Sequence, residues 1–75
     1  MIKIKPNVAT REMVGSKVRQ LRKQLGLTQE ETASRCGIFR TYLSRVESGT
    51  ANPTISVLAE LATCFDVDLR ELFRV

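Results

Sequence analysis

The sequence contains no histidine and no tryptophan, and it has only two cysteines, Cys36 and Cys64. Histidine is the commonest general base and metal ligand, so its absence excludes Ser-His-Asp and Cys-His mechanisms. Two cysteines without histidine cannot form a usual structural zinc site. No glycine-rich phosphate-binding loop is present either. We therefore expect no enzyme activity, no metal and no cofactor. We interpret the cysteines as small buried thiols, and a disulfide between them stays open.

Long apolar runs are also missing. No segment approaches the roughly 20 residues that span a bilayer, and the start of the chain, Met1 to Pro6, lacks the apolar stretch of a signal peptide. These absences predict a soluble, cytoplasmic protein that does not associate with membranes. With 75 residues, of which 43% are hydrophobic and 27% charged, we expect one small folded domain. A chain of this size has a small core, so dimerisation would help to stabilise it.

The charge is distributed unevenly along the chain. Residues 1–45 contain ten basic and three acidic side chains, a net charge of +7, whereas residues 46–75 contain two basic and five acidic ones, a net charge of −3. A molecule that is positive at one end favours a polyanionic partner for that end. The alternative is a basic helix face that only contacts solvent.

Apolar spacing and capping residues predict an all-α fold of five short helices. We expect four of them over about residues 11–25, 29–36, 40–48 and 55–65, with a last helical turn or two opening at Asp68. Residues 1–9 are predicted to be a basic N-terminal arm, either flexible or a short strand, and residues 10–75 the domain. The predicted inward stripes of the first and fourth helices are Val14, Val18, Leu21 and Leu25, and Ile55, Leu58, Ala62 and Phe65.

The C-terminal segment carries more apolar side chains than so short a helix can bury on one side. These are Leu69, Leu72, Phe73 and Val75. We favour a dimer contact for Leu69, Phe73 and Val75. Completion of the monomer core is the alternative.

Two short helices separated by a tight turn at Gly37 make a helix-turn-helix candidate in a small basic domain. The major groove of DNA admits one α-helix, whose outward polar and basic side chains can reach base edges. On the helix over residues 40–48, i and i+4 spacing places Arg40, Thr41, Ser44 and Arg45 on one face. We interpret this face as the base-reading face.

Five segments, in order and at the right spacing, resemble the Cro/CI-type (Xre-family) helix-turn-helix. They are Thr28-Gln-Glu-Glu-Thr-Ala33, Cys36-Gly-Ile38, Tyr42-Leu-Ser-Arg-Val-Glu-Ser-Gly49, Asn52-Pro-Thr54 and Leu58-Ala-Glu-Leu-Ala62. The resemblance covers about residues 14–73 and implies a lambda-repressor-like DNA-binding domain with the helix-turn-helix at helices 2 and 3. Within the family, Arg40-Thr-Tyr42 followed by Leu43-Ser44 resembles the controller proteins of restriction–modification systems.

The resemblance implies roles for individual residues. Arg40, Thr41 and Arg45 would read bases, with Ser44 as a lesser candidate. Contacts to DNA phosphates are implied for Gln29, Tyr42, Thr50 and Asn52, together with Lys17 or Arg19 from the first helix. For Tyr42, packing at the rim is an equal alternative. Arg22 and Glu47 match an ion pair that ties the first helix to the recognition helix.

Three positions depart from the family pattern. Phe39 stands where the family usually has a polar N-cap, so we expect it either to pack on the fold or to contact a thymine methyl. Thr32 replaces the usual leucine, which predicts either an under-filled core or a hydroxyl bonded back to its own helix. Asp66 replaces the usual glycine.

These observations predict a sequence-specific transcriptional regulator. It would bind a palindromic site in double-stranded DNA as a homodimer, with two recognition helices one DNA turn apart, roughly 34 Å. A narrower interpretation is an autoregulatory controller of a restriction–modification system. The alternative function is a protein-interaction module, an antitoxin or adaptor, that uses the same fold.

Overall fold

The computed structural model describes the backbone of residues 8–74 and the side chains of residues 10–74. It contains four α-helices and one 3₁₀ helix, and residues 8–74 include no strand. The elements are α1 (Val8–Gln24), α2 (Gln29–Cys36), α3 (Arg40–Ser48), α4 (Ile55–Cys64) and η1 (Leu69–Phe73). This confirms the all-α fold, with a 3₁₀ helix where a last α-helical turn was expected.

The predicted limits of α2 and α3 are correct, and those of α1 and α4 need correction. α1 begins at Val8, three residues before the predicted start, so Val8 and Ala9 are helical although we assigned them to the N-terminal arm. A proline is compatible with the beginning of a helix, so Pro6 does not prevent a helical start two residues later. The other seven residues of the predicted arm lie outside the described part of the chain. α4 ends at Cys64, with Phe65 as its C-cap.

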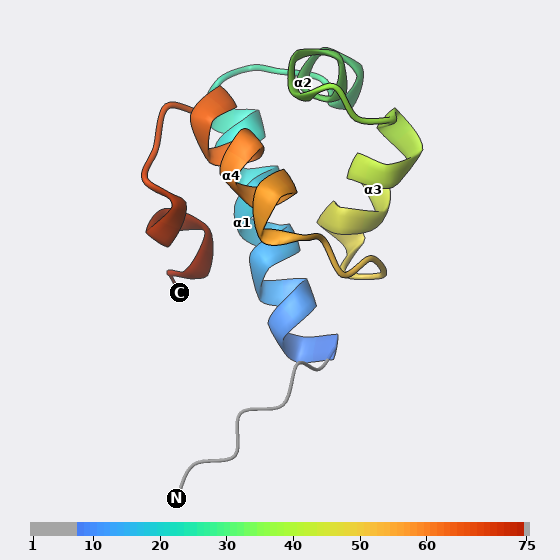
Figure 1. The fold of residues 1–75 in the computed structure, drawn as a ribbon, viewed down its shortest axis with the longest axis vertical. Coiled ribbons are helices and arrows are strands. Elements are labelled where there is room, and N and C mark those ends of the chain that lie inside the picture. Colours follow the sequence, from blue (N-terminus) through green and yellow to red (C-terminus); the bar gives the residue numbers. More distant parts are fainter. Residues whose placement is uncertain (1–7, 75) are drawn as a thin grey trace, which may run out of the picture.

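α1 is the longest helix among the described residues (Figure 1). It packs against α3 and against η1, which lie on opposite sides of it in the view of Figure 1. α2 packs against α3 and α4, and α4 packs against η1. The core between these elements consists of buried side chains from every helix, together with Ala51 from the loop after α3 and Phe65 from the C-cap of α4: Val14, Val18, Ala33, Leu43, Val46, Ala51, Leu58, Leu61, Ala62, Phe65 and Leu72.

Two predicted core residues are exposed. Leu25 follows the end of α1, and its side chain is 53% exposed; Ile55 is the first residue of α4 and is 64% exposed. Both lie at a helix end, where the apolar stripe runs beyond the neighbouring elements. Leu61, which the predicted stripe of α4 omitted, is fully buried.

α2 begins with a capping box. The amide of Glu31 donates to Thr28 Oγ1 at 3.0 Å, and the amide of Thr28 donates to Glu31 Oε1 at 2.9 Å. The hydrogen bonds from Thr28 lower the pKa of the Glu31 carboxyl below its ordinary value. The helix ends at Cys36, and its C-cap is Gly37, whose φ of 68° is the left-handed conformation that favours glycine. These local signals fix both ends of α2 and lead the chain directly into α3.

α1 and α3 approach each other closely at Gly15. A Cβ atom at this position would lie 2.2 Å from the carbonyl oxygen of Val46 and 2.8 Å from that of Glu47. Only a residue without a side chain allows this approach. The sequence interpretation missed Gly15, although a glycine inside a helical pattern is a recognised sign of close packing.

The two cysteines are free and half-buried, less buried than we expected. The Cys36 thiol contacts the Cys64 thiol, and its sulfur lies 3.9 Å from the carbonyl oxygen of Glu60. Burial, followed by the nearby Cys64, raises the pKa of Cys36 to about 12. Cys36 is therefore a protonated thiol near neutral pH.

No helix in residues 8–74 combines the length and apolar character needed to cross a membrane.

Thr32 is a buried polar residue without compensation. It is fully buried on α2, and among the described residues its hydroxyl has no hydrogen-bond partner. The interpretation that this hydroxyl bonds back to its own helix is therefore wrong. A buried hydroxyl without a partner loses its hydration and gains nothing in exchange.

We expect Thr32→Val, which keeps the shape and removes the hydroxyl, to stabilise the fold by about 1 kcal/mol. In a domain of this size the melting temperature should rise by roughly 4–8 °C. The matched control is Thr28→Val, which removes a used hydroxyl, the N-cap of α2, and should lower the melting temperature. A lower melting temperature for Thr32→Val would show that the hydroxyl has a partner.

Candidate nucleic-acid interface

α3 has one face in the core and one at the surface. Leu43, Val46 and Glu47 are buried, and they hold the helix against α1 and α2. On the other face Arg40, Thr41 and Arg45 are exposed and Ser44 is half-buried. The four residues predicted to read bases thus lie on the accessible part of α3. The only acid of this helix, Glu47, is on the buried side, so the exposed face is positive.

Arg22 and Glu47 form a buried ion pair that joins α1 to α3. Arg22 Nε donates to Glu47 Oε2 at 2.7 Å and Arg22 Nη2 donates to Glu47 Oε1 at 3.0 Å. Both residues are only 8% exposed. The hydrogen bond to Glu47 raises the pKa of Arg22 above its ordinary value, against the opposing effect of burial. Arg22 Nη1 also donates to the carbonyl oxygen of Leu27 at 2.8 Å, which fixes the loop before α2.

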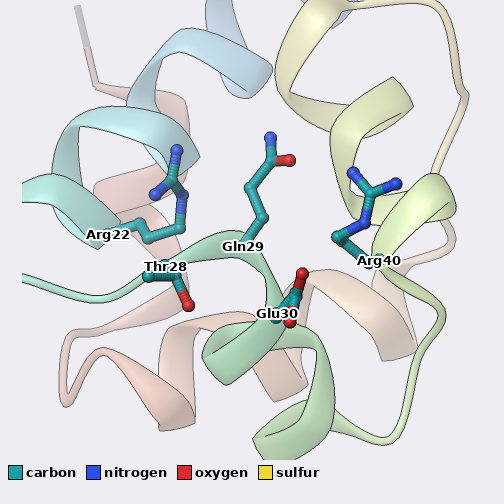
Figure 2. Close-up of a pocket in the computed structure, with 5 residues that line it drawn as sticks. All are labelled: Arg22, Thr28, Gln29, Glu30 and Arg40. Carbon is teal, nitrogen blue, oxygen red and sulfur yellow. The ribbon is translucent and has the colours of Figure 1, made fainter.

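Gln29 joins this pair. Its Nε2 atom donates to Glu47 Oε1 at 3.2 Å, a contact that the sequence interpretation missed. Gln29 is the first residue of α2 and lines an open hollow with Arg22, Thr28, Glu30 and Arg40. Figure 2 shows the Gln29 side chain extending between those of Arg22 and Arg40. The positive end of α2 and the Arg40 guanidinium make this hollow attractive to a phosphate, with Glu30 as an opposing charge and the charge of Arg22 already paired with Glu47.

The two cationic candidates on α1 differ in position. Arg19 is exposed and lines a second hollow with Gln29, Ser44 and Ser48, beside the face of α3. Lys17 is half-buried and lines a different hollow with Met13 and Arg74. The structure therefore brings Arg19, and not Lys17, together with the other candidate residues.

The segment after α3 is held by its own hydrogen bonds. The hydroxyls of Thr50 and Ser48 are 2.9 Å apart, and each contacts the carbonyl oxygen of Arg45. Arg45 Nη2 donates to the carbonyl oxygen of Thr50 at 3.4 Å. Asn52 is exposed and lines a hollow with Ile55 and Phe73, a different hollow from the one that Gln29 and Arg40 line. Tyr42 is half-buried against the core, which fits rim packing.

A helix-turn-helix family, HTH_3, matches residues 18–72 of this sequence, most of the chain. The match includes α2, the turn at Gly37 and α3, the elements that carry the positive face. This chain belongs to the helix-turn-helix family of transcriptional regulators.

Individual relatives agree with this assignment. The chain is 47% identical over 62 residues to the HTH-type transcriptional regulator y4dJ of Sinorhizobium fredii, a match that covers 83% of this chain and 80% of y4dJ. Among solved structures, the restriction-modification controller protein C.AhdI from Aeromonas hydrophila is 38% identical with a TM-score of 0.84, covering 87% of this chain and 98% of that one. SinR in complex with DNA is 31% identical with a TM-score of 0.77, covering 81% and 98%.

The protein is therefore a DNA-binding transcriptional regulator of the helix-turn-helix type and not an enzyme. The buried ion pair determines how its helix-turn-helix is presented, because α1, the loop before α2 and α3 all converge on Arg22.

We expect Arg22→Met to destabilise the protein by about 3–5 kcal/mol in urea denaturation, because Glu47 would remain buried without its partner. Arg22→Met combined with Glu47→Met should recover most of this loss. The matched control is Arg70→Met, which breaks an exposed pair with Asp68 at 3.1 Å and should leave the denaturation midpoint unchanged. If Arg22→Met and Arg70→Met changed the denaturation midpoint equally, this result would contradict a structural role for the buried pair.

Proposed function

We propose that this regulator binds a palindromic operator as a homodimer, with α3 of each subunit in the major groove. We also propose that it acts as an autoregulatory controller of a restriction–modification system. The observation that carries the first proposal is the exposed, purely basic and polar face of α3 above a buried, rigid inner face.

Base reading is assigned to the exposed face of α3. An arginine recognises guanine through two hydrogen bonds to O6 and N7, so Arg40 and Arg45 favour half-sites that contain guanine. Thr41 and Ser44 complete the face. The fixed backbone of α3 supports this role, because side chains on a rigid helix reach base edges in a defined register.

Phosphate contacts are assigned to the two hollows that flank this face. Gln29 lies at the N-terminus of α2 and is oriented by Glu47, so it can present its amide to a phosphate beside Arg40. Arg19 lines the second hollow and supplies a positive charge for a phosphate there. Tyr42, Thr50, Asn52 and Lys17 remain weaker proposals, because they lie further from these hollows or are engaged in contacts of their own.

The dimer contact is assigned to a surface formed by Ile55 and Phe73. Their side chains are 64% and 43% exposed, and both line a hollow of about 170 Å³ between α1, α4 and η1. Leu69, which we also predicted for the dimer, is half-buried against the monomer core, and Val75 lies outside the described residues. Two exposed apolar side chains around an apolar hollow suit a symmetric contact with a second copy.

The assignment to a restriction–modification system is supported by the likeness to C.AhdI, which this chain matches over nearly all of that protein. Residues Arg40 to Ser44, in the middle of the proposed DNA contact, carry the sequence similarity to controllers noted above.

The deciding experiment is a gel shift with the DNA upstream of the protein's own gene, titrated with random-sequence competitor and with salt. We expect a shift that survives the competitor and appears in two cooperative steps. A shift that the competitor abolishes, with a steep dependence on salt, would indicate only general phosphate attraction. That outcome would favour the antitoxin or adaptor function and a protein partner for the Ile55 and Phe73 surface.

Arg40→Ala should weaken binding to the specific site by about 1–3 kcal/mol and relax the base preference at one position of each half-site. Binding to random DNA should change little. The matched control is Arg70→Ala, which removes an exposed arginine from η1 and should leave both affinities unchanged. Equal weakening on specific and random DNA would identify Arg40 as a phosphate contact.

Phe73→Glu should weaken the dimer by about 2 kcal/mol or more, roughly 30-fold in the dissociation constant, because it places a charge in an apolar contact. Sedimentation equilibrium measures the change, and circular dichroism checks that the monomer stays folded. Leu25→Glu is the control, since it puts the same charge on an exposed apolar residue elsewhere. An unchanged dimer in the Phe73 variant would move the interface to another surface.

A further inference from the structure

Phe39 is the most exposed large apolar residue among the described side chains, with 84% of its surface accessible. The two other phenylalanines are much less exposed, Phe65 at 3% and Phe73 at 43%. Phe39 precedes α3 directly and occupies its N-cap position in an extended conformation. Of the two interpretations from the sequence, packing on the fold is therefore excluded.

The side chain of Phe39 also does not cap the helix that it precedes. Thr28, Thr54 and Asp68 each accept a backbone hydrogen bond as the N-caps of α2, α4 and η1, whereas the cap of α3 has no side-chain hydrogen bond. A serine or threonine at this position would stabilise the helix by about 1 kcal/mol. The fold is therefore less stable with Phe39 than with a capping residue, and the exposed ring makes no packing contact that offsets this loss.

Its place on the molecule is the leading end of the proposed recognition helix. Figure 1 shows the connection between α2 and α3 at the edge of the molecule opposite η1. The next residue is Arg40, whose side chain lines the hollow with Gln29. When a helix-turn-helix docks, the N-terminal residues of its second helix contact the base edges, so a ring in this position enters the groove with them.

We propose that Phe39 contacts the 5-methyl group of a thymine in each half-site and is a specificity-determining residue of this regulator. The proposal rests on the operator binding proposed above. The thymine methyl is an apolar group on the floor of the major groove, and phenylalanine is one of the side chains that contact it. A phenyl ring makes no hydrogen bond to a base edge, so it selects the methyl group itself. The half-site should therefore contain a thymine beside the base pair that Arg40 reads.

The surroundings of Phe39 favour this partner over a protein. A protein interface needs a contiguous apolar patch, whereas the exposed residues around Phe39 in the sequence, apart from Gly37, are polar or basic: Ser34, Arg35, Arg40 and Thr41. A single apolar ring surrounded by basic and polar residues is suited to contact a single methyl group in the groove of a polyanion.

Replacement of thymine by deoxyuridine tests the proposal, because it removes the methyl group and keeps every hydrogen-bonding atom of the base pair. The operator is defined first by footprinting with the whole protein. Each thymine is then replaced in turn, symmetrically in both half-sites, and affinities are measured for the wild type, Phe39→Ser and Phe39→Leu. Thermal melting of the three proteins is measured in parallel.

For the wild type we expect one thymine position at which deoxyuridine weakens binding by about fourfold per half-site, the value of one buried methyl group. Phe39→Ser should bind the natural operator more weakly, be insensitive to deoxyuridine at that position and melt at a higher temperature, because serine caps α3. Phe39→Leu should keep part of the sensitivity. Higher stability together with lower affinity distinguishes a DNA contact from a structural role.

Two results would overturn the proposal. If deoxyuridine has the same effect on the wild type and on Phe39→Ser at every position, the ring contacts no methyl group. If Phe39→Ser binds the natural operator as tightly as the wild type, Phe39 faces another partner. Both results leave Arg40-dependent operator binding intact, so they differ from a failure of the proposed function, in which the wild type itself would show no site-specific binding.

Discussion

The buried pair of Arg22 and Glu47 is the interaction on which the arrangement of this molecule depends. Two charges at this depth are tolerated because they satisfy each other in a bidentate geometry, and because the carbonyl of Leu27 and the amide of Gln29 add one further hydrogen bond to Arg22 and to Glu47 respectively. One guanidinium group thereby fixes α1, the loop before α2 and α3 relative to each other. An apolar contact would hold these elements together without specifying their orientation so narrowly.

The same pair divides α3 into two chemically different faces. It withdraws Glu47, the only acid of the helix, into the interior and leaves Arg40 and Arg45 at the surface. Gly15 assists by letting the backbones of α1 and α3 come into contact along this seam. The result is a positive face on a helix that the buried pair anchors to α1, which suits side chains that must meet base edges in register.

Much of the local structure follows from the sequence because it depends on short-range signals. The capping box at Thr28 and Glu31 and the turn at Gly37 fix α2 and the start of α3, and the apolar spacing identifies Leu43, Val46 and Leu58 as core. The start of α1 and the exposure of Leu25 and Ile55 were not predicted correctly. Helix ends and the reach of an apolar stripe depend on which neighbours cover them, and periodicity carries no information about that.

The sequence by itself determined the class of fold, the limits of the helix-turn-helix and the chemistry of its exposed side chains, since these depend on residues within one or two helical turns. The tertiary structure decided which of the candidates lie together: Gln29 beside Glu47 and Arg40, Arg19 toward α3 and Lys17 away from it, and Ile55 next to Phe73. It also decided that, among the described residues, the buried hydroxyl of Thr32 has no hydrogen-bond partner and the Phe39 ring is exposed. Such relations join residues far apart in the chain, and only the packing of α1 against α3 and η1 fixes the distances between them.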